Sequence, residues 1–319
     1  MLLSPASRAG RKRSTATGTG SSAASSAQGR LTLTTLTPVL TSTVSAATTI
    51  YYTPYVGRLV PLWTGTSFAM ADVGGELFQT TTDTTKSPAA CAANSNYDFF
   101  VWLDGTTYRC TRGPAWTSDA ARGTGVGTSE LLILQGINVN KIAITNGPSA
   151  NKGTYVGTIR TNAASQVDFI YGASGVAAFI GVWNMYNRVS LGTILNEGTA
   201  NWVYASATVR ALNASAIARI SVVRGFNEDA VDLFIQTYID TVGAGTSAIF
   251  GIGLDSITTF QTRMQAGGPG VGGIGSYSWR GLPGLGFHFI QQLEVVGNAA
   301  SYTAYGTSNL SVFSAGFRC

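Results

Sequence analysis

Apolar and polar residues alternate one for one along much of this sequence, and this period of two limits its fold more than any other feature. Val231, Leu233 and Ile235 are separated by single residues, and the same spacing recurs over 31–34 and 218–222. Such spacing turns one face of an extended strand toward a core and the other toward water. The sequence therefore predicts a chain built from β-strands.

The composition nearly excludes helices. Gly (39), Ser (29) and Thr (40) together supply 108 of the 319 residues, and only 11% of the residues are charged. Gly, Ser and Thr are poor in helix interiors, and helical bundles need the charged helix formers that are scarce here. Because 45% of the residues are hydrophobic, the chain can still fill a core. We expect a folded, all-β protein.

Short strands separated by turn residues are predicted along the whole body. The pair Asp104-Gly105 is a direct hairpin signal between two of them. The further predicted strands cover 97–104, 106–110, 155–160, 166–171, 176–183, 188–195, 247–253, 287–296 and 310–317. Many short strands with frequent turn residues predict an antiparallel β-sandwich of jelly-roll type.

One stretch, 169–187, contains no charged residue and is the candidate for a membrane span, since about 20 apolar residues cross a bilayer. Gly172, Gly175 and Gly181 interrupt it. Paired glycines favour a tight turn over 172–175 between two strands. We therefore predict two strands and no membrane insertion.

The net charge of +5 is concentrated in the first 30 residues. Residues 31–319 contain 15 basic and 15 acidic residues, so this body is neutral and lacks the basic face typical of nucleic-acid binding. Residues 4–29 have no hydrophobic period, and we predict that 1–30 is an extended anchoring arm that a partner orders. Its basic residues are Arg8, Arg11, Lys12, Arg13 and Arg30.

Two stretches rich in turn-forming residues organise the rest of the chain. The turn-rich stretch 146–153 separates two strand-dense parts, so we predict an N-terminal β region over 31–145 and a C-terminal β-sandwich region over 146–319. The stretch 267–286 holds nine glycines and is predicted to be a long loop. Loops of this length are frequently functional.

Residues with catalytic or metal chemistry are few and isolated. His288 is the single histidine and has no cysteine beside it, whereas zinc needs three or four ligands, so we expect a packed or surface histidine. Cys91, Cys110 and Cys319 fit incidental thiols in a reducing cytoplasm better than a disulfide framework, and the first residues lack the apolar run of a secretory signal. We expect no metal, no cofactor and no enzymatic activity.

The densest acidic cluster is Glu228, Asp229 and Asp232. Glycoside hydrolysis needs two carboxyl groups across one sugar bond, and Asp229 with Glu130 or Glu76 is the candidate pair. The favoured interpretation is a solvated turn that enters the strand 231–240.

Aromatic residues in polar segments are the candidates for glycan contact. A flat apolar ring stacks on the apolar side of a pyranose while neighbouring polar groups fix its orientation. The alternative is that these rings cap the ends of the sandwich. The candidates are Trp116, Tyr277, Trp279, Tyr302 and Tyr305.

Several short runs, in order from about residue 29 to near 295, resemble a segment common in structural proteins of tailed phages and prophages. The runs are 29–33, 47–57, 60–63, 113–116, 121–125, 136–140 and 223–229.

This resemblance implies a virion appendage, a short fibre or spike that is commonly a homotrimer and is attached through its N-terminal arm. The implied partners are a portal, adaptor, neck or capsid protein and a host surface glycan, and the implied location is the virion after assembly in the host cytoplasm. Because heptads are absent, we expect trimerisation through apolar strand faces and edge pairing. Two alternatives stay open, a glycan-degrading tailspike enzyme and a capsid decoration protein.

Overall fold

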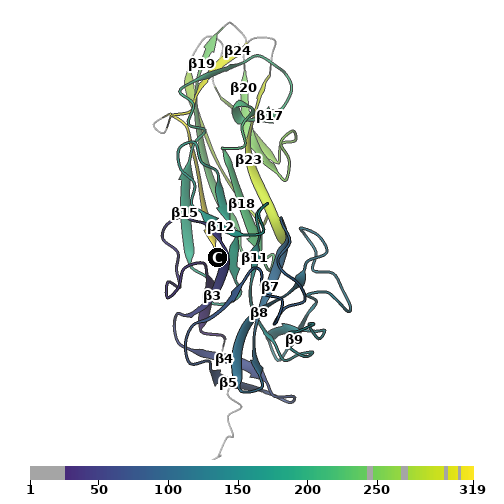
Figure 1. Ribbon diagram of the computed structural model, residues 1–319. Coiled ribbons are helices and arrows are strands. Elements are labelled where there is room, and N and C mark those ends of the chain that lie inside the picture. Colours follow the sequence, from purple (N-terminus) through teal and green to yellow (C-terminus); the bar gives the residue numbers. More distant parts are fainter. Residues whose placement is uncertain (1–25, 243–246, 267–271, 298–300, 308–309) are drawn as a thin grey trace, which may run out of the picture.

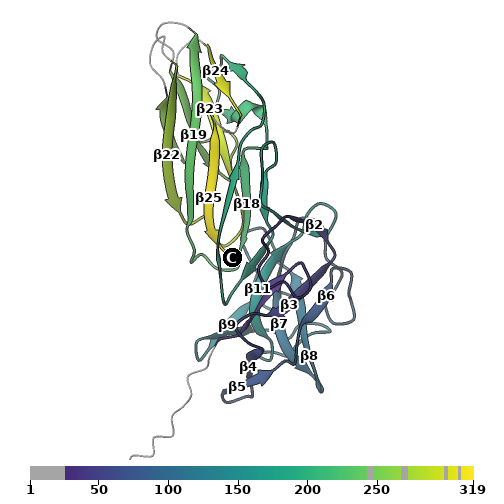
Figure 2. The same ribbon diagram turned by 90° about the vertical axis from the view of Figure 1, so that its left-hand side faces the viewer.

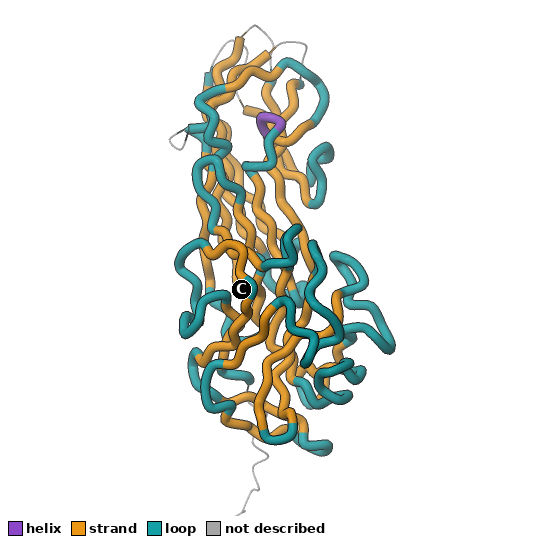
Figure 3. The backbone as a smooth tube through the Cα atoms, in the orientation of Figure 1, coloured by secondary structure: helices purple, strands orange, loops and turns teal. Residues whose placement is uncertain are grey.

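The computed structural model describes residues 26–242, 247–266, 272–297, 301–307 and 310–319. These residues form an elongated body of two lobes stacked end to end (Figures 1 and 2). Strands make up nearly all of its regular structure (Figure 3), and the one helix within the described ranges is the single 3-10 turn η1 (Leu212–Ala214). The all-β prediction is confirmed.

The first lobe, which we call the proximal lobe, contains three antiparallel sheets. The largest has the strand order β8-β7-β11-β10-β9, with β14 also paired to β11. A three-stranded sheet has the order β1-β3-β6, and β4 and β5 form a hairpin. The strands are β1 (Gly29–Thr32), β3 (Thr49–Pro54), β4 (Leu59–Trp63), β5 (Phe68–Asp72), β6 (Leu77–Thr80), β7 (Asn96–Asp104), β8 (Thr107–Ala115), β9 (Leu131–Leu134), β10 (Ile137–Asn140), β11 (Thr154–Arg160) and β14 (Val182–Asn184).

The second lobe, which we call the distal sandwich, packs an eight-stranded sheet against a six-stranded sheet. The eight-stranded sheet has the order β2-β12-β13-β18-β23-β20-β21, with β17 beside β23. Its strands are β2 (Val44–Ala47), β12 (Val167–Ile170), β13 (Ala178–Ile180), β17 (Arg210–Ala211), β18 (Arg219–Arg224), β20 (Ala248–Leu254), β21 (Thr262–Ala266) and β23 (Gly286–Val296). All of its pairs are antiparallel except β13 with β18, which a long crossover connects.

The six-stranded sheet has the order β15-β25-β19-β24-β16, with β22 on the other side of β19. Its strands are β15 (Ser190–Leu195), β16 (Trp202–Tyr204), β19 (Val231–Val242), β22 (Gly273–Gly281), β24 (Ser301–Tyr305) and β25 (Val312–Arg318). Val231, Leu233 and Ile235 of β19 are buried, as their alternation predicted. Phe250 and Tyr302 pack edge to face across the two sheets, with 5.4 Å between ring centroids.

The hairpin signals of the sequence correspond to real turns. Gly105 has φ of +62° where β7 turns into β8, a conformation that favours glycine. Gly172 and Gly175 also have positive φ, and they connect β12 to its antiparallel neighbour β13. The stretch 169–187 is therefore strands and turns. Within the described residues, no helix has the length and apolar character that crossing a membrane requires.

The chain changes lobe at other places than the sequence suggested. The predicted boundary over 146–153 lies between β10 and β11, which pair in one sheet through Val139 and Thr154. Conversely, β2 lies early in the chain but pairs with β12 of the distal sandwich. Turn-forming residues mark where a chain reverses, and a reversal inside a sheet has the same composition as a reversal between lobes.

The predicted arm also ends earlier than residue 30. Ala27 and Arg30 are buried, and Gly29–Thr32 is strand β1, paired with β3. The Arg30 guanidinium donates to the carbonyls of Pro38 (2.9 Å) and Cys319 (3.0 Å), so this cation belongs to the body. Arg8, Arg11, Lys12 and Arg13 lie outside the described residues.

Candidate functional site

The first aromatic candidate, Trp116, is packed inside the proximal lobe. Only 6% of its surface is exposed, and its ring lies 4.4 Å below the guanidinium of Arg122. Its backbone N–H donates to the carbonyl of Asn96 at 2.9 Å. Trp116 therefore supports the fold and presents no free ring face to a sugar.

Tyr277 and Trp279 lie in strand β22, which corrects the predicted loop over 267–286 for residues 273–281; residues 267–271 lie outside the described part of the chain. In register with β19, Tyr277 stands beside Ile235 and Trp279 beside Leu233, so both rings face the interior of the sandwich. The glycines of this segment allow close packing. A Cβ on Gly281, for example, would lie 2.1 Å from the Trp279 ring.

Tyr302 and Tyr305 lie in strand β24 and face opposite sides of the sheet. Tyr302 is fully buried, and its hydroxyl donates to Glu294 at 2.7 Å. Tyr305 is partly buried on the outer side, where its ring lies 5.3 Å from that of Tyr238. The structure thus brings no group of the five aromatic candidates together on a surface.

The acidic cluster is an ion-pair network at the end of the distal sandwich nearest the proximal lobe. Arg188 contacts Glu228 at 3.0 Å and also binds the buried carboxylate of Asp229. Asp232 lies 3.4 Å from Arg280. A groove of about 400 Å³ runs between these groups.

This arrangement differs from the solvated turn that the sequence suggested, because Asp229 is buried. One guanidinium engages both Glu228 and Asp229. A glycoside hydrolase instead needs one carboxyl group free to hold a proton and a second across the sugar bond. These ion pairs connect the segment before β15 to the turn before β19.

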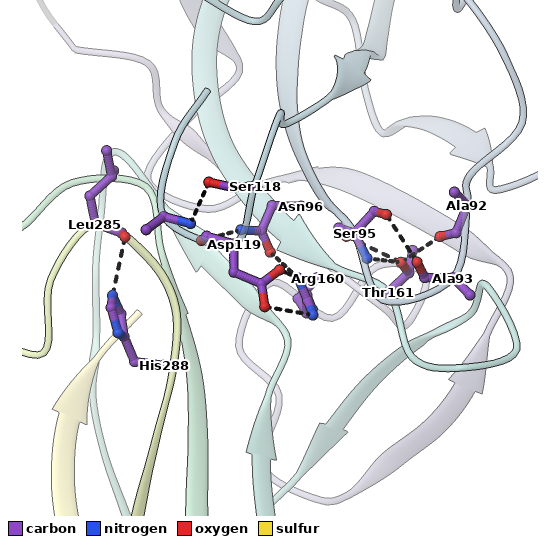
Figure 4. A network of polar contacts seen from close by, with 11 residues as sticks. Ala92, Ala93, Ser95, Asn96, Ser118, Asp119, Arg160, Thr161, Leu285 and His288 are labelled. Atoms are coloured by element: carbon purple, nitrogen blue, oxygen red, sulfur yellow. Dashed lines mark hydrogen bonds and ion pairs between the residues drawn. The ribbon is translucent and has the colours of Figure 1, made fainter. Parts of the chain in front are cut away.

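The junction between the lobes is a second polar network (Figure 4). Arg160 of β11 binds the carboxylate of Asp119, and the Asn96 side chain donates to the Asp119 carbonyl at 2.8 Å. The same carbonyl accepts the N–H of Phe287 from β23 at 2.8 Å. Asp119 therefore connects the proximal lobe to β23 of the distal sandwich.

His288 lies beside this junction (Figure 4), and its side chain is 12% exposed. Its Nδ1 is 2.7 Å from the Asp255 carboxylate, and its Nε2 is 3.1 Å from the carbonyl of Leu285. The imidazole donates to both acceptors together only when both nitrogens carry a proton. Among the described residues, no group of three acidic, histidine or cysteine side chains is placed to hold a metal ion.

The three cysteines are free and buried. Burial raises the pKa of Cys91 and of Cys319 to about 11, and it raises the pKa of Cys110 further. A protonated, inaccessible thiol is a poor nucleophile. These side chains act as small packing groups.

One surface, the outer side of the six-stranded sheet, was not predicted from the sequence; we call it the outer face. Its exposed apolar side chains are Ile194, Val203, Phe234 and Ile274, to which the partly buried Tyr238 and Tyr305 add aromatic area. A signal was present, because Phe234 and Tyr238 occupy positions of β19 that the alternation assigns to water.

Comparison with known proteins identifies no family. No protein-family model matches the chain, and no curated protein matches it. Among solved structures, it is similar to the insecticidal delta-endotoxin Cry8Ea1 from Bacillus thuringiensis, at 8% identity and a TM-score of 0.25, over 90% of this chain and 51% of that one. The chain thus spans about half the length of Cry8Ea1.

Two structures of infectious bursal disease virus are also similar. The Gx strain matches at 12% identity and a TM-score of 0.27, over 87% of this chain and 78% of that one. The Gt strain matches at 9% identity and a TM-score of 0.28, over 91% and 77%. Scores this low assign this chain to no family and to no function.

Proposed function

We propose that this chain is a structural protein of a phage virion, a short fibre-like appendage that its basic N-terminal arm attaches to the particle. The observation that carries the proposal is that the two ends of the elongated body are formed by different parts of the chain. The described chain starts in the proximal lobe, whereas the far end of the distal sandwich is formed by β19, β20 and β24 (Figure 1). Attachment at one end and presentation of the other is the arrangement an appendage needs.

The charge distribution supports the same proposal. The arm carries four cations ahead of Arg30 and no acid, while the body is neutral. A compact positive segment suits an acidic surface on a portal, adaptor, neck or capsid protein. The resemblance to tailed-phage structural proteins points the same way. Glycan adsorption has less support, because four of the five aromatic candidates pack into the body.

The test removes residues 2–25 and follows the shortened chain into particles. We expect a folded body, with the circular dichroism and melting temperature of the full chain, because these residues precede the packed segment that starts at Ala27. Particles purified from cells that make the shortened chain should lack it in immunoblots, while the full chain should appear at one position under gold labelling.

A matched pair of variants separates charge from length. Replacing Arg8, Arg11, Lys12 and Arg13 by Gln should abolish incorporation, whereas Arg→Lys at the three arginines should preserve it. Incorporation of the Gln variant at the level of the full chain would reject attachment through the charged arm.

A further inference from the structure

The outer face has a composition that a solvated sheet face rarely shows. Ile194, Phe234 and Ile274 are 69%, 44% and 60% exposed. In register across β15, β25 and β19, Ile194 and Phe234 lie in one row with Ser314 between them. Ile274 lies beside Tyr238, four residues further along β19, and Gln236 and Ser276 occupy the row between. The apolar side chains thus form two rows on one surface, with one polar row between them.

Charge is confined to the ends of this face. Asp232, Arg280 and Arg318 lie at the proximal end and Asp240 near the far end, and the outward positions between them on these strands are apolar, Gly, Ser, Thr or Gln. Antiparallel sheets with one face open to water ordinarily cover that face with polar and charged side chains. A face with apolar rings and small residues in its middle is suited to burial.

We infer that the outer face is a self-association surface and that its occupant is a second copy of this chain. This inference rests on the proposed function, an appendage of a kind that the resemblance implies is commonly a homotrimer, and it identifies the surface through which copies associate.

The size of the face fits this occupant. It is four strands wide along most of β19, so with about 4.8 Å per strand and about 3.3 Å per residue it covers roughly 750 Å². A stable protein interface buries about 800 Å² on each partner. One face of this size therefore supplies a whole interface, and a small ligand would leave most of it open.

The charges at the two edges fit a copy related by rotation about an axis along the strands. Arg280 stands exposed on β22 at one edge, and Glu228 stands exposed near the start of β15 at the other, where Arg188 holds it. Such a rotation brings edge β22 of one copy beside edge β15 of the next at the same height, so that opposite charges meet. A twofold axis gives this contact over the whole outer face of two copies, and a threefold axis divides the outer face of each copy between its two neighbours.

The experiment measures the mass of the full-length chain by light scattering at micromolar concentration. The parent protein should be an oligomer, and Phe234→Lys with Ile194→Lys should return the mass to the 33.2 kDa of a single chain, a threefold drop for a trimer. Ile133→Lys is the matched control, because Ile133 is 65% exposed on β9 of the proximal lobe, away from the outer face. The control should keep the parent mass.

A second readout covers the case in which the double variant fails to fold. Since the native cysteines are buried, Ile194→Cys introduces an accessible thiol on the outer face. Maleimide should label it slowly in the oligomer and quickly on dilution to monomers, whereas Ile133→Cys should react quickly throughout. A parent protein that is monomeric, a double variant that keeps the parent mass, or rapid labelling of Ile194→Cys in the oligomer would overturn the inference.

These outcomes are independent of the arm. A monomeric chain that still enters particles would remove the self-association surface and leave the attachment proposal standing. An oligomer that never enters particles would do the reverse.

Discussion

At the scale of single residues, buried charged side chains connect distant segments of this protein, although only 11% of its residues are charged. Arg122 is the central example: its Nε lies 2.6 Å from the fully buried carboxylate of Asp98, and its Nη2 donates to the carbonyl of Gly225 at 2.7 Å. Burial raises the pKa of Asp98, and the guanidinium opposes that shift. Phe226 lies 5.1 Å from the same guanidinium. One side chain thus connects the proximal lobe to the turn after β18.

We expect Arg122→Met to destabilise the protein by about 3–5 kcal/mol, because it leaves the Asp98 carboxylate buried without its partner. Adding Asp98→Asn should recover part of that loss, since the neutral amide costs less to bury. Chemical denaturation of the two variants and the parent measures both effects. A double variant no more stable than Arg122→Met would show that the charge of Asp98 is not the source.

Residue roles of this kind could not be predicted from the sequence. Asp98 and Arg122 are 24 positions apart with no pattern that links them. The packing of the aromatic candidates for glycan contact was not predicted for a different reason. Tyr277 and Trp279 alternate with Ser276 and Ser278, so the strand signal was present, but the many glycines around them resemble a loop. Close packing between strands uses glycine as readily as a loop does.

At the scale of elements, β11 shows how tightly the proximal lobe is packed. It pairs with β7, β10 and β14, and its register with β7 shifts between Tyr155 and Gly157. A Cβ on Gly157 would lie 2.3 Å from the carbonyl oxygen of Trp183 in β14 and 2.8 Å from Leu31 of β1. The absence of a side chain at Gly157 therefore lets three strands approach one another.

Gly157→Ala should accordingly lower stability by about 1–3 kcal/mol, because the backbone of β14 must move to admit the methyl group. The matched control is Gly192→Ala in β15, where the nearest atom would lie at an ordinary 3.7 Å. That variant should leave the melting temperature unchanged or slightly raised, since alanine loses less entropy on folding. Equal melting temperatures for the two variants would contradict this account.

Individual strands were predictable because their alternation and turns are local. The sheet to which each strand belongs was not. β2 pairs with β12 through Ala47 and Val167, and β15 pairs with β25 through Leu195 and Phe313. Such pairings are chosen by core packing between distant segments. The all-β sandwich therefore followed from the sequence, whereas the division into lobes did not.

At the scale of the whole molecule, aromatic contacts join the two lobes at their junction in addition to the polar network. Phe226, after β18 of the distal sandwich, packs against Tyr155 of β11 and Trp183 of β14, with ring centroids 5.9 and 6.2 Å apart. Arg160 of β11 lies 4.3 Å from the ring of Phe287 in β23. These contacts add to the hydrogen bonds of Asp119 and Arg122.

We therefore expect one calorimetric unfolding transition for both lobes, with equal calorimetric and van't Hoff enthalpies. Phe226→Ala should lower its midpoint, since deleting a packed aromatic ring costs about 3 kcal/mol. Phe78→Ala, which truncates a ring that is 67% exposed, should leave it nearly unchanged. Two separate transitions in the parent protein would show that the lobes unfold independently.

The pairing of β2 with β12 and the contact of Arg30 with Cys319 have a consequence for biosynthesis. A ribosome adds roughly 5–20 residues per second, so tens of seconds separate the emergence of Arg30 from that of Cys319. Contacts this distant along the chain also make folding slow. Strand β2 keeps an unpaired edge until β12, about 120 residues later in the chain, has emerged, and a chaperone that shields this edge acts on a segment made early in translation.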